Sequence, residues 1–185
     1  MRIGLMGGSF NPVHIAHISA AIQVKDALEL DKIILIPAYV SPFKTDKRQV
    51  SGEHRYNMLC IATKEYDFFE ISSFELDSGG VSYTYITTEH YRSLFPDDEI
   101  YFIMGDEAYA QFDKWKYPDR IRSAAQICVV TRDGSNVLGA VYVNIPPMPV
   151  SSTEIRKKIA RGESADGILH PEVYEYIKKH NLYEG

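Results

Sequence analysis

Short apolar runs, separated by longer stretches of helical period, constrain the fold of this chain more than any other feature. We expect buried strands at 2–6, 33–37, 100–104, 126–131 and 141–145. Between the first two runs, Ile18, Ala21 and Ile22 recur at helical spacing and predict a helix over 18–30. Such alternation is typical of a mainly parallel sheet with helices on both faces, so we expect a doubly wound α/β fold.

The rest of the chain adds further elements but no domain boundary. We expect helices at 53–66, 84–95, 152–161 and 171–180, and a strand-like segment at 68–76. Two linker-like segments, 40–52 and 133–139, do not shift the composition. A length of 185 residues is within the usual size of one domain, so we expect a single domain over 1–185.

Composition excludes several classes of function. The formal net charge is -5, which argues against binding to a nucleic-acid polymer. No window approaches the ~18 uninterrupted apolar residues that a membrane helix needs. Cys60 and Cys128 lie in apolar runs and are interpreted as buried thiols of a reducing compartment, with a lone disulfide as the alternative. We therefore expect a cytoplasmic protein without membrane contact.

The segment GGSFNPVHIAH, residues 7–17, is the first candidate for chemistry. Gly7 and Gly8 follow the first expected strand, and without side chains they let backbone N–H groups approach a phosphate closely. His14 and His17 are three residues apart and share one face of the first helical turn, so we interpret them as phosphate ligands. A metal site on the two histidines is the alternative, although no Cys or carboxylate completes a ligand set at a recognisable spacing.

The segment VSSTEIR, residues 150–156, is the second candidate. A hydroxyl of Ser151, Ser152 or Thr153 can cap the helix expected there. The same helix start offers backbone donors and Arg156 to an anion. Two helix starts that both follow strands of one parallel sheet would face a single cleft and could hold a polyphosphate.

These two segments resemble a known family. GGSFNPVHIAH resembles the GGxFNPxHxGH motif of the nucleotidyltransferase superfamily that includes the nicotinate-nucleotide adenylyltransferases, and VSSTEIR resembles its ISSTxIR motif. Further segments are similar to that superfamily or to its bacterial nicotinate-specific branch, namely 37–44, 54–58, 82–88, 105–115 and the tail at 169–183. The resemblance extends over nearly the whole chain and implies a Rossmann-like fold.

The resemblance implies transfer of AMP from ATP to nicotinate mononucleotide, giving deamido-NAD and pyrophosphate in NAD biosynthesis. It implies direct in-line attack without a covalent intermediate, because a phosphate oxygen is already a competent nucleophile. It assigns four cations to the phosphates, namely His14, His17, Lys44 and Arg156, with protonated His17 stabilising the transition state. Mg²⁺ would be carried mainly by ATP, so no metal ligands are expected on the chain.

The resemblance also implies which residues contact the two nucleotides. The expected ATP-binding residues are Gly7, Gly8, Ser9, Phe10, Gly105, Glu107, Ser152, Thr153 and Ile155. For the pyridine half, Trp115 would stack on the ring, and Tyr83 and Thr84 would lie at its carboxylate. A core tryptophan and a plain helix N-cap at Thr84 are the alternatives. Asp106 beside Glu107 leaves open which carboxylate contacts a ribose.

The sequence leaves alternatives for the acceptor of AMP and for the class of protein. Nicotinamide mononucleotide or phosphopantetheine could replace nicotinate mononucleotide as acceptor. A regulatory module could bind nucleotide without turnover, although the retention of all four expected cations argues against it. A homo-oligomer also stays open.

Overall fold

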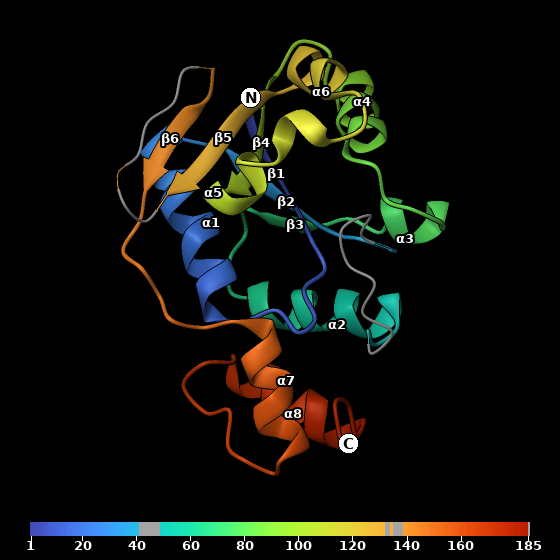
Figure 1. Cartoon of the computed structure of the whole chain (residues 1–185), viewed down its shortest axis with the longest axis vertical. Coiled ribbons are helices and arrows are strands. Elements are labelled where there is room, and N and C mark those ends of the chain that lie inside the picture. Colours follow the sequence, from blue (N-terminus) through green and yellow to red (C-terminus); the bar gives the residue numbers. More distant parts are fainter. Residues whose placement is uncertain (41–48, 132–133, 135–138, 185) are drawn as a thin grey trace.

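The strands of this chain form one parallel sheet (Figure 1). The structure is a computed structural model, and it describes residues 1–40, 49–131, 134 and 139–184. Within these residues the strands are β1 (Arg2–Gly8), β2 (Lys32–Pro37), β3 (Phe69–Ile71), β4 (Glu99–Gly105), β5 (Gln126–Thr131) and β6 (Val141–Asn144). Their order is β3-β2-β1-β4-β5-β6, and each neighbouring pair is parallel. The expected doubly wound α/β fold is confirmed.

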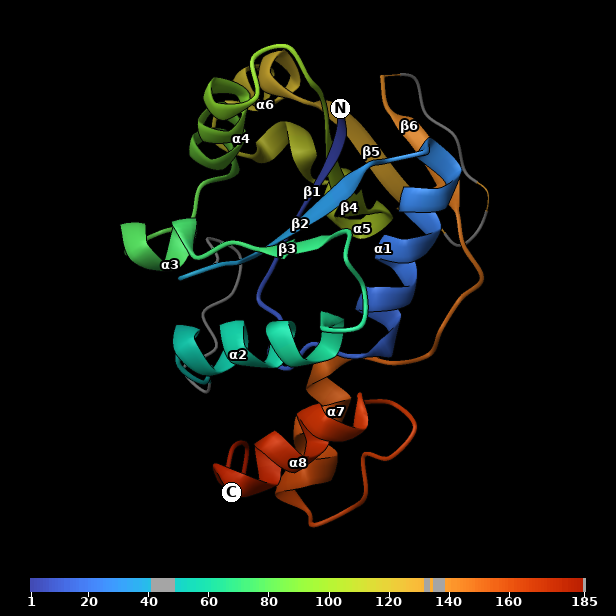
Figure 2. The ribbon, with the colours of Figure 1, turned by 180° about the vertical axis from the view of Figure 1, so that it is seen from behind.

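Helices cover both faces of the sheet. They are α1 (Ile15–Leu28), α2 (Gly52–Thr63), α3 (Phe74–Ser78), α4 (Thr84–Leu94), α5 (Asp106–Tyr109), α6 (Pro118–Ala124), α7 (Ser152–Ala160) and α8 (Pro171–Lys179), with a 3₁₀ turn η1 (Phe112–Lys114). Figures 1 and 2 show α1 and α2 across the sheet from α4 and α6, and α7 beside α8 at the opposite end of the molecule from α4 and α6.

The sequence of β2 explains why both faces are covered. Ile33 and Leu35 belong to one buried cluster, together with residues of α1, α2, α7 and α8. Ile34 and Ile36 belong to a second cluster, together with residues of α4 and α6. Because successive strand residues point to opposite faces, an unbroken apolar run requires a hydrophobic layer on each side.

The order of the strands reverses between β1 and β4. The chain builds outwards through β2 and β3 on one side of β1, and through β5 and β6 beyond β4 on the other. In open parallel sheets such a reversal leaves a crevice at the carboxyl ends of the two strands. Here those ends are Gly8, within the first candidate segment, and Gly105, one of the expected ATP-binding residues.

Several segments differ from the sequence-based expectation, including α5 and η1, which were not expected. Only 69–71 of the strand-like segment 68–76 pairs with the sheet, and α3 begins at Phe74. The Ser72 hydroxyl accepts a hydrogen bond from the Phe74 N–H, and Ser73 bonds the Asp77 carboxylate, so side chains bond locally and begin a helical turn. The helix α6 was missed, although Pro118 at its first position is a usual start signal.

The membrane and thiol expectations can be compared with the described residues. No helix among them is long and apolar enough to span a bilayer. Cys60 and Cys128 are both free thiols, so the alternative of a disulfide between them is wrong.

Candidate active site

The first candidate segment forms a loop between β1 and α1, called here the 9–14 loop. Contrary to expectation, Gly7 and Gly8 precede the loop and belong to β1. A Cβ atom on Gly8 would lie 3.1–3.3 Å from ring atoms of Phe10. Phe10 is buried and adopts a left-handed φ of 45°. The missing side chain of Gly8 is therefore explained by the close approach of the Phe10 ring.

A cleft of about 710 Å³ opens beside the 9–14 loop. It brings together most of the predicted phosphate-binding residues, namely Gly7, Ser9, His14, His17, Gly105, Ser152, Thr153 and Arg156. Gly8, Phe10, Glu107 and Ile155 are not among its lining residues. Phe10 and Ile155 instead contribute to the buried core beneath it. The cleft lies at the carboxyl ends of β1 and β4, where the topology predicts a ligand.

The two histidines stack at the start of α1. Their ring centroids lie 3.7 Å apart with an interplanar angle of 28°. The backbone N–H of His14 donates to Nδ1 of His17 over 3.3 Å. A ring nitrogen that accepts this bond carries no proton, so His17 is here a neutral ring with its N–H at Nε2, and not the protonated ring that the resemblance implied. Because His17 lines the cleft, this nitrogen is the donor that His17 can offer to a bound anion.

His14 is not the cation that the sequence suggested. Its side chain is only 6% exposed, and burial lowers its pKa to about 4. Its Nδ1 has no hydrogen-bond partner. The buried His14 is therefore neutral near pH 7, and a neutral imidazole can still donate one N–H to a phosphate.

The buried His14 predicts a pH dependence of stability. The unfolded chain, with a histidine pKa near 6.5, binds a proton that the native protein excludes until about pH 4. Lowering the pH from about 6.5 to 4 should therefore cost roughly 3 kcal/mol of unfolding free energy. Urea unfolding between pH 7.5 and 4.5 should show this loss in the parent and not in His14→Asn. The exposed His180, changed to Asn, provides the control, and an equal loss in all three proteins would contradict the assignment.

The start of α7 is bonded to the 9–14 loop. Ser151 caps the helix by accepting the Glu154 N–H over 3.3 Å, as one of the sequence alternatives proposed. The Ser152 hydroxyl donates to the Pro12 carbonyl over 2.9 Å. Nη1 of Arg156 donates to the Asn11 carbonyl, also over 2.9 Å. The two predicted helix starts therefore meet at one cleft, and Arg156 is oriented by the loop beside it.

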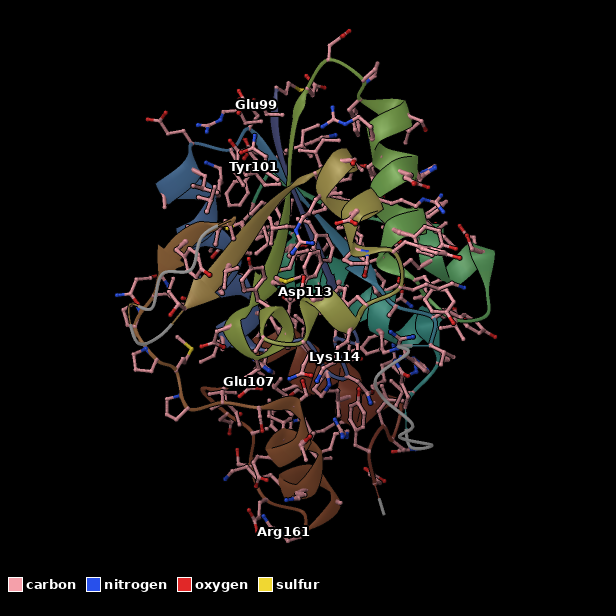
Figure 3. The ribbon with its side chains drawn as sticks, turned by 45° about the horizontal axis from the view of Figure 1, so that its top comes forward. Glu99, Tyr101, Glu107, Asp113, Lys114 and Arg161 are labelled. Atoms are coloured by element: carbon pink, nitrogen blue, oxygen red, sulfur yellow. The ribbon has the colours of Figure 1, made fainter. Side chains whose placement is uncertain are left out.

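The end of β4 places Asp106, and not Glu107, at the cleft. Asp106 lines it, whereas Glu107 lies on the exposed surface of α5, as labelled in Figure 3. The Asp106 carboxylate also accepts the Glu107 N–H over 2.8 Å. Of the two neighbouring carboxylates, Asp106 is placed to meet a ligand in the cleft.

None of the three predicted pyridine residues is among those that line the cleft, and two of them stand at the start of α4. Tyr83 occupies the N-cap position and Thr84 is the first helical residue, so the alternative of a Thr84 N-cap is wrong. The half-buried Trp115 packs on Phe102, with ring centroids 6.3 Å apart. The Phe102 ring in turn lies 3.9 Å from the Cβ position of Gly7. We call Tyr83, Phe102 and Trp115 the aromatic group. Through Phe102 it approaches Gly7, which lines the cleft at the carboxyl end of β1.

Lys44 lies outside the described residues. The chain leaves the described part at Val40, whose carbonyl accepts the Ser82 N–H over 2.9 Å, next to Tyr83. It returns at Gln49, which lines the cleft. The described residues on either side of that segment are therefore Val40, bonded beside Tyr83, and Gln49, at the cleft.

Sequence reasoning missed four residues that organise the site. Lys116 places its ammonium 4.3 Å from the ring centroid of Tyr83, at the start of α4. Arg55, 1% exposed, donates to the Ser9 carbonyl over 2.9 Å. Asn11 accepts bonds from the C-terminal Tyr183 and from Val50. All three of Asn11, Arg55 and Tyr183 stood within family-like segments, but no local pattern indicated the contact between Tyr183 and Asn11.

The arrangement of the histidines does not suit a metal. Nδ1 of His17 is engaged by the backbone, and the two rings stack face to face instead of converging on one point. Across the described residues, no three His, Cys, Asp or Glu side chains are grouped to hold a metal ion.

Comparisons with known proteins decide the family. A family model described as cytidylyltransferase-like matches residues 5–158. A probable nicotinate-nucleotide adenylyltransferase of Thermus thermophilus is 39% identical, with 99% of this chain and 100% of the relative covered. The chain belongs to the nicotinate-nucleotide adenylyltransferase family.

Two further comparisons support membership of the nicotinate-nucleotide adenylyltransferase family or the fold of its members. A probable enzyme of this name from Clostridium tetani is 36% identical over 97% of both chains. The nicotinic acid mononucleotide adenylyltransferase of Plasmodium falciparum, solved in complex with NaAD, superposes with a TM-score of 0.81. That pair is 21% identical over 98% of this chain and 97% of the other, so this likeness shows the shared Rossmann-like fold.

Proposed function

We propose that this chain transfers AMP from ATP to nicotinate mononucleotide, forming deamido-NAD and pyrophosphate. The observation that carries the proposal is the junction of the 9–14 loop with α7. It gathers two helix starts, His17 and Arg156 at one cleft at the strand-order reversal. The curated relatives named for this activity align over nearly their whole length, which supports the same assignment.

The transfer needs alignment and charge stabilisation more than a protein nucleophile. An oxygen of the nicotinate mononucleotide phosphate attacks the α-phosphorus of ATP, and the bond from that phosphorus to the β-phosphate oxygen breaks. The electron pair of the broken bond leaves on pyrophosphate. Attack in line with the leaving group requires both nucleotides to be held end to end, which a single cleft with an adjoining aromatic site provides.

Each site residue then has a distinct electrostatic role. Nε2–H of His17 donates to the phosphate oxygens that gain charge in the transition state. The planar fork of Arg156 and the ammonium of Lys44 hold the outer phosphates, which become the leaving group. His14 acts as a neutral donor, and the first amides of α7 complete the anion site.

The divalent ion belongs to the substrate in this proposal. ATP brings Mg²⁺ bound to its phosphates, where the ion neutralises part of the charge on the leaving pyrophosphate. Among the described residues, the cleft offers the Arg156 guanidinium and two helix starts to those phosphates.

The aromatic group beside the cleft receives the pyridine half. Trp115 stacks on the ring, and Tyr83 flanks it at the start of α4. The first-turn amides at Thr84 bind the pyridine carboxylate. The ammonium of Lys116 lies at this same helix start and adds a positive charge there. This arrangement favours the acid over the uncharged amide.

The two cysteine thiols support two parts of the proposal. They argue against a covalent intermediate on cysteine, and they are consistent with a cytoplasmic location. Burial raises the pKa of Cys128 to about 12 and also raises that of Cys60, so neither thiol is a nucleophile near pH 7. Free thiols of this kind are typical of a reducing compartment.

Pyrophosphate release tests the proposed function. The purified chain with ATP and Mg²⁺ should release pyrophosphate rapidly with nicotinate mononucleotide, and more slowly with nicotinamide mononucleotide or phosphopantetheine. Without an acceptor, no burst stoichiometric with the enzyme should appear, because no covalent adenylyl intermediate forms. Preference for another acceptor would overturn the substrate assignment, a burst would overturn direct transfer, and silence with all three would favour a regulatory module.

A further inference from the structure

The C-terminal tail returns to the back of the 9–14 loop. The turn after α8 guides it there, because Asn181 adopts a left-handed φ of 52° and the Leu182 N–H bonds the Ile177 carbonyl over 3.0 Å. This is the bonding pattern of a Schellman motif, and its apolar pair, Leu182 and Ile177, is buried in the same core as Phe10. The motif leaves Tyr183 directed towards the loop.

Tyr183 makes one defined contact with that loop. Its hydroxyl donates to Oδ1 of Asn11 over 2.8 Å, and Asn11 is only 5% exposed. Burial raises the pKa of Tyr183, and this effect exceeds the lowering by the nearby guanidinium groups of Arg156 and Arg55. The phenol therefore keeps its proton and remains a donor at physiological pH.

Asn11 connects Tyr183 to Arg156, the residue expected to hold the outer phosphates. Its carbonyl accepts the bond from Arg156, and its side-chain oxygen also accepts the Val50 N–H over 3.4 Å. Arg55 extends the same network by donating to the carbonyls of Val50 and Ser9. The bond from Tyr183 therefore holds the peptide that orients Arg156.

We infer that Tyr183 is a positioning residue for adenylyl transfer, acting through Asn11 to fix the 9–14 loop and Arg156. Tyr183 is not expected to touch substrate. This inference rests on the proposed function for its effect on turnover, but the loop contact itself does not depend on the reaction.

Tyr183→Phe tests the inference, because it removes only the hydroxyl. Loss of one neutral hydrogen bond should raise amide hydrogen exchange across residues 9–17 by about three- to tenfold. Turnover should fall by a similar factor at a temperature where the protein is fully folded, with kcat affected more than KM. Exchange in α4, across the sheet, should stay unchanged.

Tyr176→Phe is the matched control. Its hydroxyl is also bonded, to His54 at 2.9 Å and Asn57 at 3.2 Å, but it contacts α2 and not the 9–14 loop. This variant should leave both exchange at 9–17 and kcat unchanged. Equal loop exchange in Tyr183→Phe and the parent would overturn the inference, and so would faster loop exchange with unaltered turnover. If the parent turns over none of nicotinate mononucleotide, nicotinamide mononucleotide and phosphopantetheine, the proposed function fails. Amide exchange at residues 9–17 still tests whether Tyr183 holds the loop.

Discussion

His17→Ala should lower kcat by about 10²- to 10³-fold while changing the dissociation constant of ATP by only a few-fold. The reason is that Nε2–H of His17 meets the phosphate oxygens that gain charge as pyrophosphate leaves, and such preorganised donors act mainly on the transition state. Single-turnover kinetics and equilibrium ATP binding separate the two quantities.

His180→Ala provides the control for this change. His180 is an exposed histidine at the end of α8, in ring contact with Tyr176 and outside the cleft. It should keep parental kcat and ATP affinity. If His17→Ala lost ATP binding in proportion to turnover, His17 would be a ground-state ligand, and its role in the transition state would be wrong.

Arg156→Met should lower kcat/KM by about 10²-fold, with the KM of ATP raised and kcat reduced. The change removes the planar fork that holds the outer phosphates, and it also removes the bond to the Asn11 carbonyl. Arg156→Lys keeps a positive charge but loses the fork, so its loss should lie between those of the parent and Arg156→Met. Steady-state kinetics with varied ATP measures all three.

Arg161→Met is the matched control, since Arg161 is the C-cap residue of the same helix. Figure 3 shows Arg161 at the far end of α7, away from the sheet, where it pairs with Glu163 at 2.9 Å. An exposed pair of this kind contributes little, so near-parental kinetics are expected. Equal kinetics in Arg156→Met and Arg161→Met would contradict the placement of Arg156 at the phosphates.

The pattern of the sequence predicted the sheet and the position of the cleft. An apolar run such as 33–37 needs a hydrophobic layer on each face, and helical period between runs supplies those layers. The two motifs follow strands, so their meeting at the carboxyl edge was predictable as well. These features depend on local pattern and on rules that apply to every parallel sheet.

Features that depend on burial and on distant contacts were not predictable. Whether His14 is charged depends on how deeply the folded protein covers it, and no local pattern reports that depth. The contact of Tyr183 with Asn11 joins residues 172 positions apart. Which of Asp106 and Glu107 faces the cleft depends on how the short helix α5 is oriented at the end of β4. Each of these is decided by tertiary packing.

The transfer itself is tested most directly by isotope labelling in one reaction. Nicotinate mononucleotide with ¹⁸O on its phosphate is mixed with an equal amount of unlabelled nicotinamide mononucleotide. ATP and Mg²⁺ are then added, and the masses of the products are measured by mass spectrometry. The account predicts deamido-NAD that retains all the label, with none in pyrophosphate, in excess over NAD. Label in pyrophosphate, or NAD as the main product, would contradict it.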